Sequence, residues 1–162
     1  MRITPWLTTL LLMGCNVAPT LSLNEFMASN VSTLTDANGG TPDWIELVNT
    51  GDEAVDLTGF FLSDDATQLG RGPLPEGVEV EAGGYVLFLC DSDVTDDPQF
   101  LPFRLSAGGE ELILSYDFGD GPEIVEQTSF TGQTSDVSMA RIPDGDGEWA
   151  ESTSPSPGEA NE

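Results

Sequence analysis

Carboxylates are the only abundant side chains in this sequence that could do chemistry. The chain has 29 Asp and Glu residues against four Arg, with no Lys and no His. The missing His excludes Ser-His-Asp and Cys-His catalysis and His-ligated zinc in this chain. The missing Lys excludes Schiff-base chemistry and a phosphate-binding P-loop. Paired carboxylates of the glycosidase kind remain conceivable, but among so many acidic residues a pair in sequence indicates nothing. We therefore expect no catalytic residues, no cofactor and no enzyme activity.

Two acidic segments have oxygen ligands at spacings that calcium loops use. Asp144, Asp146 and Glu148 alternate with glycines, and a second segment contains Asp91, Asp93, Asp96 and Asp97. Alternating oxygen ligands suit Ca²⁺, but neither segment has the complete EF-hand pattern or a Glu at its twelfth position. The alternative is a solvated acidic surface. We expect this alternative, with no specific metal site and at most weak binding of divalent cations.

The net charge limits the partners that this chain can have. Its formal net charge is −25 at pH 7. Nucleic-acid binding depends on Lys and Arg side chains that neutralise phosphates, so we expect no nucleic-acid partner. The same charge repels anionic membrane surfaces and attracts basic partners or divalent cations, and it keeps a protein soluble. A saline habitat is another explanation for such acidity.

A short apolar stretch precedes the first cysteine. Residues 6–13 are mostly apolar and follow Arg2, and Gly14 separates them from Cys15. A membrane-spanning helix needs about 20 apolar residues, so this stretch has the length of a signal-peptide core instead. Residues 12–15, Leu-Met-Gly-Cys, resemble the lipobox of bacterial lipoproteins, in which the cysteine is acylated and becomes the new N-terminus. Cys15 is the predicted lipidation site, and an ordinary signal peptide with an incidental cysteine is the alternative.

Cys90 would then be the only thiol left unmodified. It follows the apolar run 85–89, so we expect a buried, inert cysteine at the end of a strand. A reactive thiol, or one that pairs with another molecule, is the alternative.

Beyond the N-terminal segment, the hydrophobic pattern has a period of two. Apolar runs are short, and turns rich in Gly and Pro separate them. No stretch shows a sustained helical period with caps. Many short strands with regular turns predict an all-β sandwich or barrel, in which Trp44 is large enough to fill core space. The predicted strands are 21–26, 44–48, 54–57, 60–63, 78–80, 85–90, 100–105, 111–116, 124–128 and 137–142, with a loop at 71–77.

Several blocks of this sequence resemble lamin-tail domains, in the order that the family has them. The most specific is residues 43–65, which begins Asp-Trp-Ile-Glu-Leu-Val-Asn. The resemblance implies an immunoglobulin-like β-sandwich. Residues 65–77 depart from the pattern, because an aromatic residue is expected there, and this leaves the local strand pairing open. The other blocks are 24–30, 82–85, 105–110, 138–149 and the closing Pro-Gly-x-x-Asn element within 156–161.

These observations predict four segments. Residues 1–14 are a lipoprotein signal peptide, 15–21 a tether, 22–150 the lamin-tail-like β-sandwich, and 151–162 an acidic Ser/Pro tail. The six residues 16–21 that follow Cys15 reach at most about 20 Å, so the sandwich would lie close to the membrane. The tail is too polar to bury a core, and we expect it to be extended or disordered.

The predicted function is a non-catalytic lipoprotein of the bacterial cell envelope. It would be anchored to a membrane through lipid on Cys15, and its sandwich would act as a structural or binding module for a protein or polysaccharide that the sequence does not identify. One alternative is an accessory subunit that acts in trans with a secreted hydrolase. Another is a calcium-dependent adhesion module.

Overall fold

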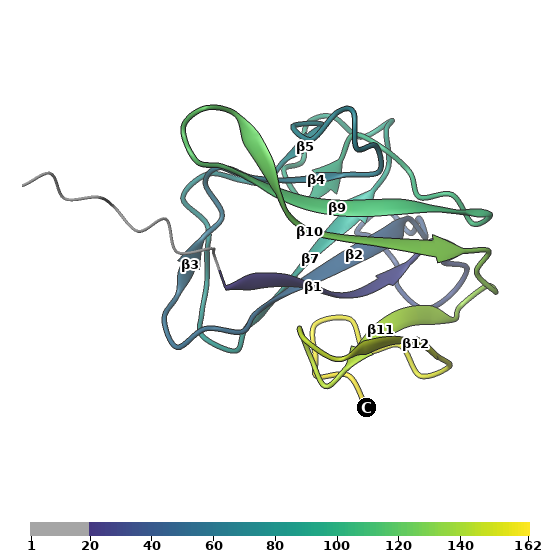
Figure 1. Ribbon diagram of the computed structural model, residues 1–162. Coiled ribbons are helices and arrows are strands. Elements are labelled where there is room, and N and C mark those ends of the chain that lie inside the picture. Colours follow the sequence, from purple (N-terminus) through teal and green to yellow (C-terminus); the bar gives the residue numbers. More distant parts are fainter. Residues whose placement is uncertain (1–19) are drawn as a thin grey trace, which may run out of the picture.

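Two β-sheets packed face to face form the main body of the protein (Figure 1). The computed structural model describes residues 20–162, and every regular element within this range is a strand. No helix in the described range is long and apolar enough to cross a membrane. The strands are β1 Leu21–Met27, β2 Asp43–Asn49, β3 Val55–Asp56, β4 Phe60–Ser63, β5 Gly72–Pro73, β6 Glu79–Val80, β7 Tyr85–Cys90, β8 Phe100–Leu101, β9 Gly109–Asp117, β10 Pro122–Thr131, β11 Ser138–Ile142 and β12 Glu148–Ser152.

The larger sheet has six strands in the order β12-β11-β1-β2-β7-β8, and the smaller has four in the order β10-β9-β4-β5. Strands β3 and β6 form a separate two-stranded ribbon. All pairs are antiparallel except β7 and β8. The fold is therefore all-β and an immunoglobulin-like β-sandwich, as the sequence predicted.

The core lies between the two large sheets and is built by alternation. Ile45 and Leu47 of β2 point into it, and Leu62 of β4 and Leu114 of β9 meet them from the smaller sheet. All four side chains are completely buried. Because successive residues of a strand face opposite sides, Trp44 and Glu46, the neighbours of Ile45, lie on the outer face of the large sheet.

The outer face of the large sheet is covered in part by a second apolar cluster. Trp44 is completely buried there with Met27 and Leu89, and Leu34, from the loop between β1 and β2, packs against them. The prediction that Trp44 is buried is confirmed. The tryptophan fills space between the sheet and this loop, however, instead of the space between the sheets.

Most predicted strands are present, and the differences have local causes. The predicted loop at 71–77 contains β5, where Gly72 pairs with Leu62 of β4. A Cβ atom on Gly72 would lie 2.8 Å from the Leu62 carbonyl oxygen, so this close pairing requires glycine. The predicted strand 100–105 is regular only at β8, although Leu101, Phe103 and Leu105 all point inward and are buried.

The C-terminal tail differs from its prediction. Strand β12 extends to Ser152, beyond the predicted end of the sandwich, and pairs with β11 along its whole length. Residues 156–161 then return across the large sheet and hydrogen-bond to it. The expectation of an extended or disordered tail was wrong, because its bonding partners lie far away in sequence. Figure 1 shows the tail as a yellow loop beside β11 and β12.

The predicted signal peptide, Cys15 and most of the predicted tether lie outside the described residues. The first strand of the described range, β1, begins at Leu21.

Candidate functional site

The residues of the first acidic segment do not converge: Asp144 and Asp146 lie in the turn between β11 and β12, and Glu148 begins β12. The Asp144 carboxylate points inward and accepts hydrogen bonds from Asn24 Nδ2 at 3.1 Å and from the Tyr85 hydroxyl at 2.7 Å. Asp146 is exposed, and Glu148 is exposed on β12. Within residues 20–162 no group of three or more His, Cys, Asp or Glu side chains is arranged to hold a metal ion.

The second acidic loop carries its own counter-ion. Arg104 Nη2 lies 2.7 Å from both Asp91 Oδ1 and Asp93 Oδ2. The backbone N–H of Asp93, followed by the Arg104 side chain, holds the pKa of the Asp91 carboxyl below its usual value. An arginine therefore occupies the position where a cation would have to bind.

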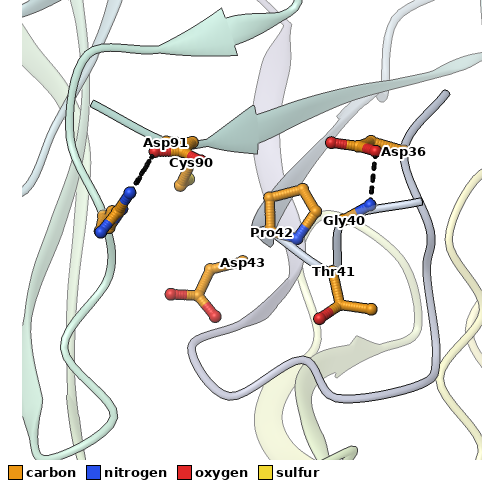
Figure 2. Close-up of a pocket in the computed structure, with 8 residues that line it drawn as sticks. Asp36, Gly40, Thr41, Pro42, Asp43, Cys90 and Asp91 are labelled. Carbon is orange, nitrogen blue, oxygen red and sulfur yellow. Dashed lines mark hydrogen bonds and ion pairs between the residues drawn. The ribbon is translucent and has the colours of Figure 1, made fainter. Parts of the chain in front are cut away.

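A surface hollow of about 240 Å³ lies beside this ion pair. Figure 2 shows Asp36, Asp43, Cys90 and Asp91 around it, with the Asp91–Arg104 contact as a dashed line. Burial raises the pKa of Asp43 above its usual value. Cys90 is 2% exposed and burial raises the pKa of its thiol well above the usual value, so the thiolate is strongly disfavoured. The prediction that Cys90 is buried at the end of a strand is confirmed.

The most unusual chemistry in the described residues is a pair of buried carboxyl groups on the outer face of the large sheet. Glu25 of β1 and Glu46 of β2 are directly opposite each other in the antiparallel register. Their side chains are 1% and 0% exposed. Acidic side chains are rarely buried so completely unless they have partners, so the groups around them decide what the pair does.

A β-bulge in β1 brings a third polar residue into the same cluster. The register shifts between Leu23 and Glu25, which leaves Asn24 as the extra residue. The Asn24 Nδ2 group donates to Glu46 Oε1 at 2.9 Å, and its Oδ1 accepts from the Gly145 N–H at 2.9 Å. Asn24 thereby joins the Glu pair to the turn that contains Asp144.

The C-terminal tail covers the pair. The Ser156 N–H donates to Glu25 Oε2 at 3.1 Å, and the Gly158 N–H donates to Glu46 Oε2. Asn161 Nδ2 donates to the backbone oxygens of Asn24 at 3.2 Å and of Arg141 at 3.0 Å. We call this arrangement the carboxylate clasp; it consists of Asn24, Glu25, Glu46, Asp144, Ser156, Gly158 and Asn161.

Burial dominates the electrostatics of the clasp. It raises the pKa of Glu46 to about 7, against the hydrogen bonds from Asn24 and Gly158, with Glu25 and Asp144 adding like-charge repulsion. It also raises the pKa of Glu25, although the Ser138 hydroxyl and Ser156 act in the opposite direction. Burial and the bond to Asp144 raise the pKa of Tyr85 to about 12.

The clasp can hold and exchange protons near neutral pH, but both Glu side chains are closed to a substrate. Its geometry therefore suits a structural role, in which the clasp holds the C-terminal tail against the large sheet. Only indirect signals of the clasp can be found in the sequence. Glu46 alternates with Ile45 and Leu47, which predicts an outward position, and the Pro-Gly-x-x-Asn element contributes Gly158 and Asn161. The proximity of these groups depends on strand register and on the path of the tail.

Comparison with known proteins identifies one family. The family model described as Lamin Tail Domain matches residues 16–146. The match includes Glu25, Glu46 and Asp144 and ends before β12 and the tail. No curated protein and no solved structure matches the chain significantly.

Proposed function

Because the chain belongs to the lamin tail domain family, we propose that it is a non-catalytic module displayed at a bacterial cell envelope and held there by lipid on Cys15. The family's immunoglobulin-like domain is a structural or binding module. The finer proposal is that this sandwich presents its surface to a protein or polysaccharide partner close to the membrane.

The observation that carries the proposal is the short distance in sequence between Cys15 and the fold. Strand β1 begins at Leu21 and pairs on both sides, with β2 and with β11. A link of six residues spans at most about 20 Å. Acyl chains on Cys15 would therefore keep the sandwich within a short reach of the bilayer, which suits a displayed module.

The charge of the domain supports a partner that is not nucleic acid. The arginines of the described range are Arg71, Arg104 and Arg141, and each is paired with a carboxylate of the same chain. No cationic side chain of residues 20–162 is left to neutralise phosphates, which nucleic-acid binding needs. The surface instead favours neutral or basic partners.

Replacing the predicted lipidation site tests the proposal. Cys15→Ser should move the protein from the membrane fraction to the soluble exported fraction, because acyl chains supply about 0.8 kcal/mol per buried CH₂ and several chains make release negligible. The measurement is immunoblotting of membrane and soluble fractions from cells that express the full chain.

Cys90→Ser is the matched control, since it removes the other thiol, which is buried in the sandwich. It should leave the protein in the membrane fraction. If Cys15→Ser stays with the membrane as the wild type does, the lipid-anchor proposal is wrong.

A further inference from the structure

A second, smaller hollow lies on the outer side of the large sheet, beyond Trp44. Its volume is about 180 Å³. Leu87 and Leu89 of β7, Phe100 of β8 and Leu34 of the β1–β2 loop give it an apolar wall, and Asp36 and Asp97 contribute carboxylates. We call it the leucine hollow. It combines partly exposed apolar side chains with negative charge. A surface that is acidic only to stay solvated has no reason to place apolar side chains beside its carboxylates.

Both carboxylates are held in place by the backbone and keep one oxygen available. Asp36 Oδ1 accepts from the backbone N–H groups of Asn38 and Gly40 at 2.8 and 2.7 Å. Asp97 Oδ1 accepts from the Gln99 N–H at 2.9 Å. Within residues 20–162, the Oδ2 atom of neither side chain accepts a hydrogen bond. The hollow therefore offers two fixed acceptor oxygens beside an apolar wall.

No basic side chain of the described domain can satisfy these oxygens. The chain has no Lys, and Arg71, Arg104 and Arg141 are bound to other carboxylates. The neighbouring hollow of Figure 2 differs in this respect, because Arg104 already neutralises Asp91 there. The leucine hollow has no such internal cation, so a cation that binds in it has to come from a partner.

We propose that the leucine hollow binds the side chain of a lysine or arginine of a partner polypeptide, with its aliphatic stem on the leucines and its charged end at Asp36 and Asp97. Long basic side chains cover apolar surface with their methylenes while the charged head stays at the edge. The inference deepens the proposed binding role by specifying the chemistry of the partner. It does not depend on the lipid anchor.

Three short peptides test which part of the side chain the hollow recognises. The probes are acetyl-Ala-Lys-Ala-amide, the same peptide with norleucine, and the same peptide with 2,4-diaminobutyrate. Norleucine keeps the stem without the charge, and diaminobutyrate keeps the charge with a stem that is shorter by two methylenes. Titration of the full chain in neutral detergent, followed by NMR, should give saturable shifts at residues 34–38, 87–89 and 97–100 with the lysine peptide.

The lysine peptide should bind about ten-fold more tightly than either analogue. Each buried methylene contributes about a factor of four, and charge-assisted hydrogen bonds to carboxylates are stronger than neutral ones. Equal affinity for the lysine and norleucine peptides would overturn the proposal. Equal affinity for the lysine and diaminobutyrate peptides would do so too, since it would mean that only the overall charge attracts the peptide.

A charge-matched pair of variants locates the binding. Asp97→Asn keeps an acceptor for the Gln99 N–H but removes the charge, and it should weaken lysine-peptide binding by about five-fold. Asp120→Asn removes the same charge from the exposed turn between β9 and β10, which Figure 1 shows at the opposite end of the sandwich from the β1–β2 loop. It should weaken binding by less than about two-fold at 0.15 M salt.

Equal losses of lysine-peptide affinity in these two variants would mean that the overall negative charge of the protein attracts the peptide, and this would refute the site. Because the peptide series uses the unmodified chain, it remains decisive if Asp97→Asn is unstable. Cys15→Ser serves to separate the two proposals. Peptide binding that survives in Cys15→Ser, together with failure of the fractionation test, would reject the anchor and retain the leucine hollow.

Discussion

The pH dependence of stability should reveal the clasp through Glu46. The Glu46 carboxyl is completely buried, faces Glu25 across the β1–β2 pair, and has a pKa raised to about 7 from its usual value of 4.5. In the folded protein it keeps its proton up to about pH 7, whereas in the unfolded chain it releases the proton near pH 4.5. The stabilisation from this group is therefore fully present below pH 4.5 and is lost as the pH rises to about 7.

The size of this effect follows from the shift. One pKa unit corresponds to 1.36 kcal/mol, so a shift from 4.5 to about 7 predicts a loss of about 3 kcal/mol across that pH window. Glu46→Gln removes the titration and keeps the size of the side chain. Its amide can accept from only one of the two donors, Asn24 Nδ2 or the Gly158 N–H, which costs about 1–3 kcal/mol at every pH.

The unfolding free energy of the wild type minus that of Glu46→Gln should therefore fall by about 3 kcal/mol between pH 4.5 and pH 7, to near or below zero, and then stay level. Urea unfolding of the full chain at constant ionic strength, repeated from pH 4.5 to 8.5, measures this. Glu123→Gln removes one negative charge from an exposed position on β10, and its curve should run parallel to the wild type. If the Glu46→Gln curve also runs parallel to the wild type, the clasp does not titrate as the geometry implies.

Two further variants test the contacts that hold the edges of the sandwich. Arg141 forms a largely buried ion pair with Glu126 and lies 4.7 Å from the centre of the Trp149 ring. Arg141→Ala should lower the free energy of urea unfolding by about 3–5 kcal/mol, because the Glu126 charge is left unpaired. Adding Glu126→Gln should recover part of this loss, and a double variant no more stable than Arg141→Ala would refute the explanation. Asp136 accepts hydrogen bonds from the backbone N–H groups of Ser32, Val31 and Thr33. The Ser32 and Val31 N–H groups, together with the Ser32 and Thr33 hydroxyls, hold the pKa of Asp136 well below the usual range. Asp136→Ala should expose residues 30–34 to limited proteolysis at neutral pH, whereas wild-type protein should resist until the pH falls well below 3.8, and equal cleavage of both at neutral pH would contradict this role.

The sequence was sufficient to predict those features that depend on neighbouring residues or on composition alone. Strands β4 and β7 have the bounds that were predicted, because alternating and continuous apolar runs between Gly-rich turns encode a strand within a few residues. The buried state of Trp44 and Cys90 followed from the same runs. The acidic composition by itself excluded the Lys- and His-dependent chemistries, and the order of the lamin-tail blocks predicted the family that the comparison then identified.

Strand β12 and the tail show where local information ends. Residues 148–152, Glu-Trp-Ala-Glu-Ser, contain one large apolar side chain and therefore no alternation to detect. Their pairing is decided by β11, and Trp149 is fixed by the Phe26 ring 5.2 Å away in β1. The polar composition of the tail predicted disorder. The tail is ordered because it hydrogen-bonds to Glu25 and Glu46, which lie more than a hundred residues earlier in the chain, and its own composition carries no sign of them.

The sequence by itself therefore determined the class of fold, the family, the charge and the candidate lipid site at Cys15. Only the tertiary structure decided what the carboxylates do. Asp144, which the sequence places in a segment with calcium-loop spacing, bonds to Asn24 and Tyr85, and Arg104 pairs with Asp91 in the other acidic loop. The physical reason is that strand register, a single bulge at Asn24 and the return of the tail set the distances between charged groups. The pKa of a carboxyl and its partners depend on those distances and on burial, which residue types and spacing do not contain.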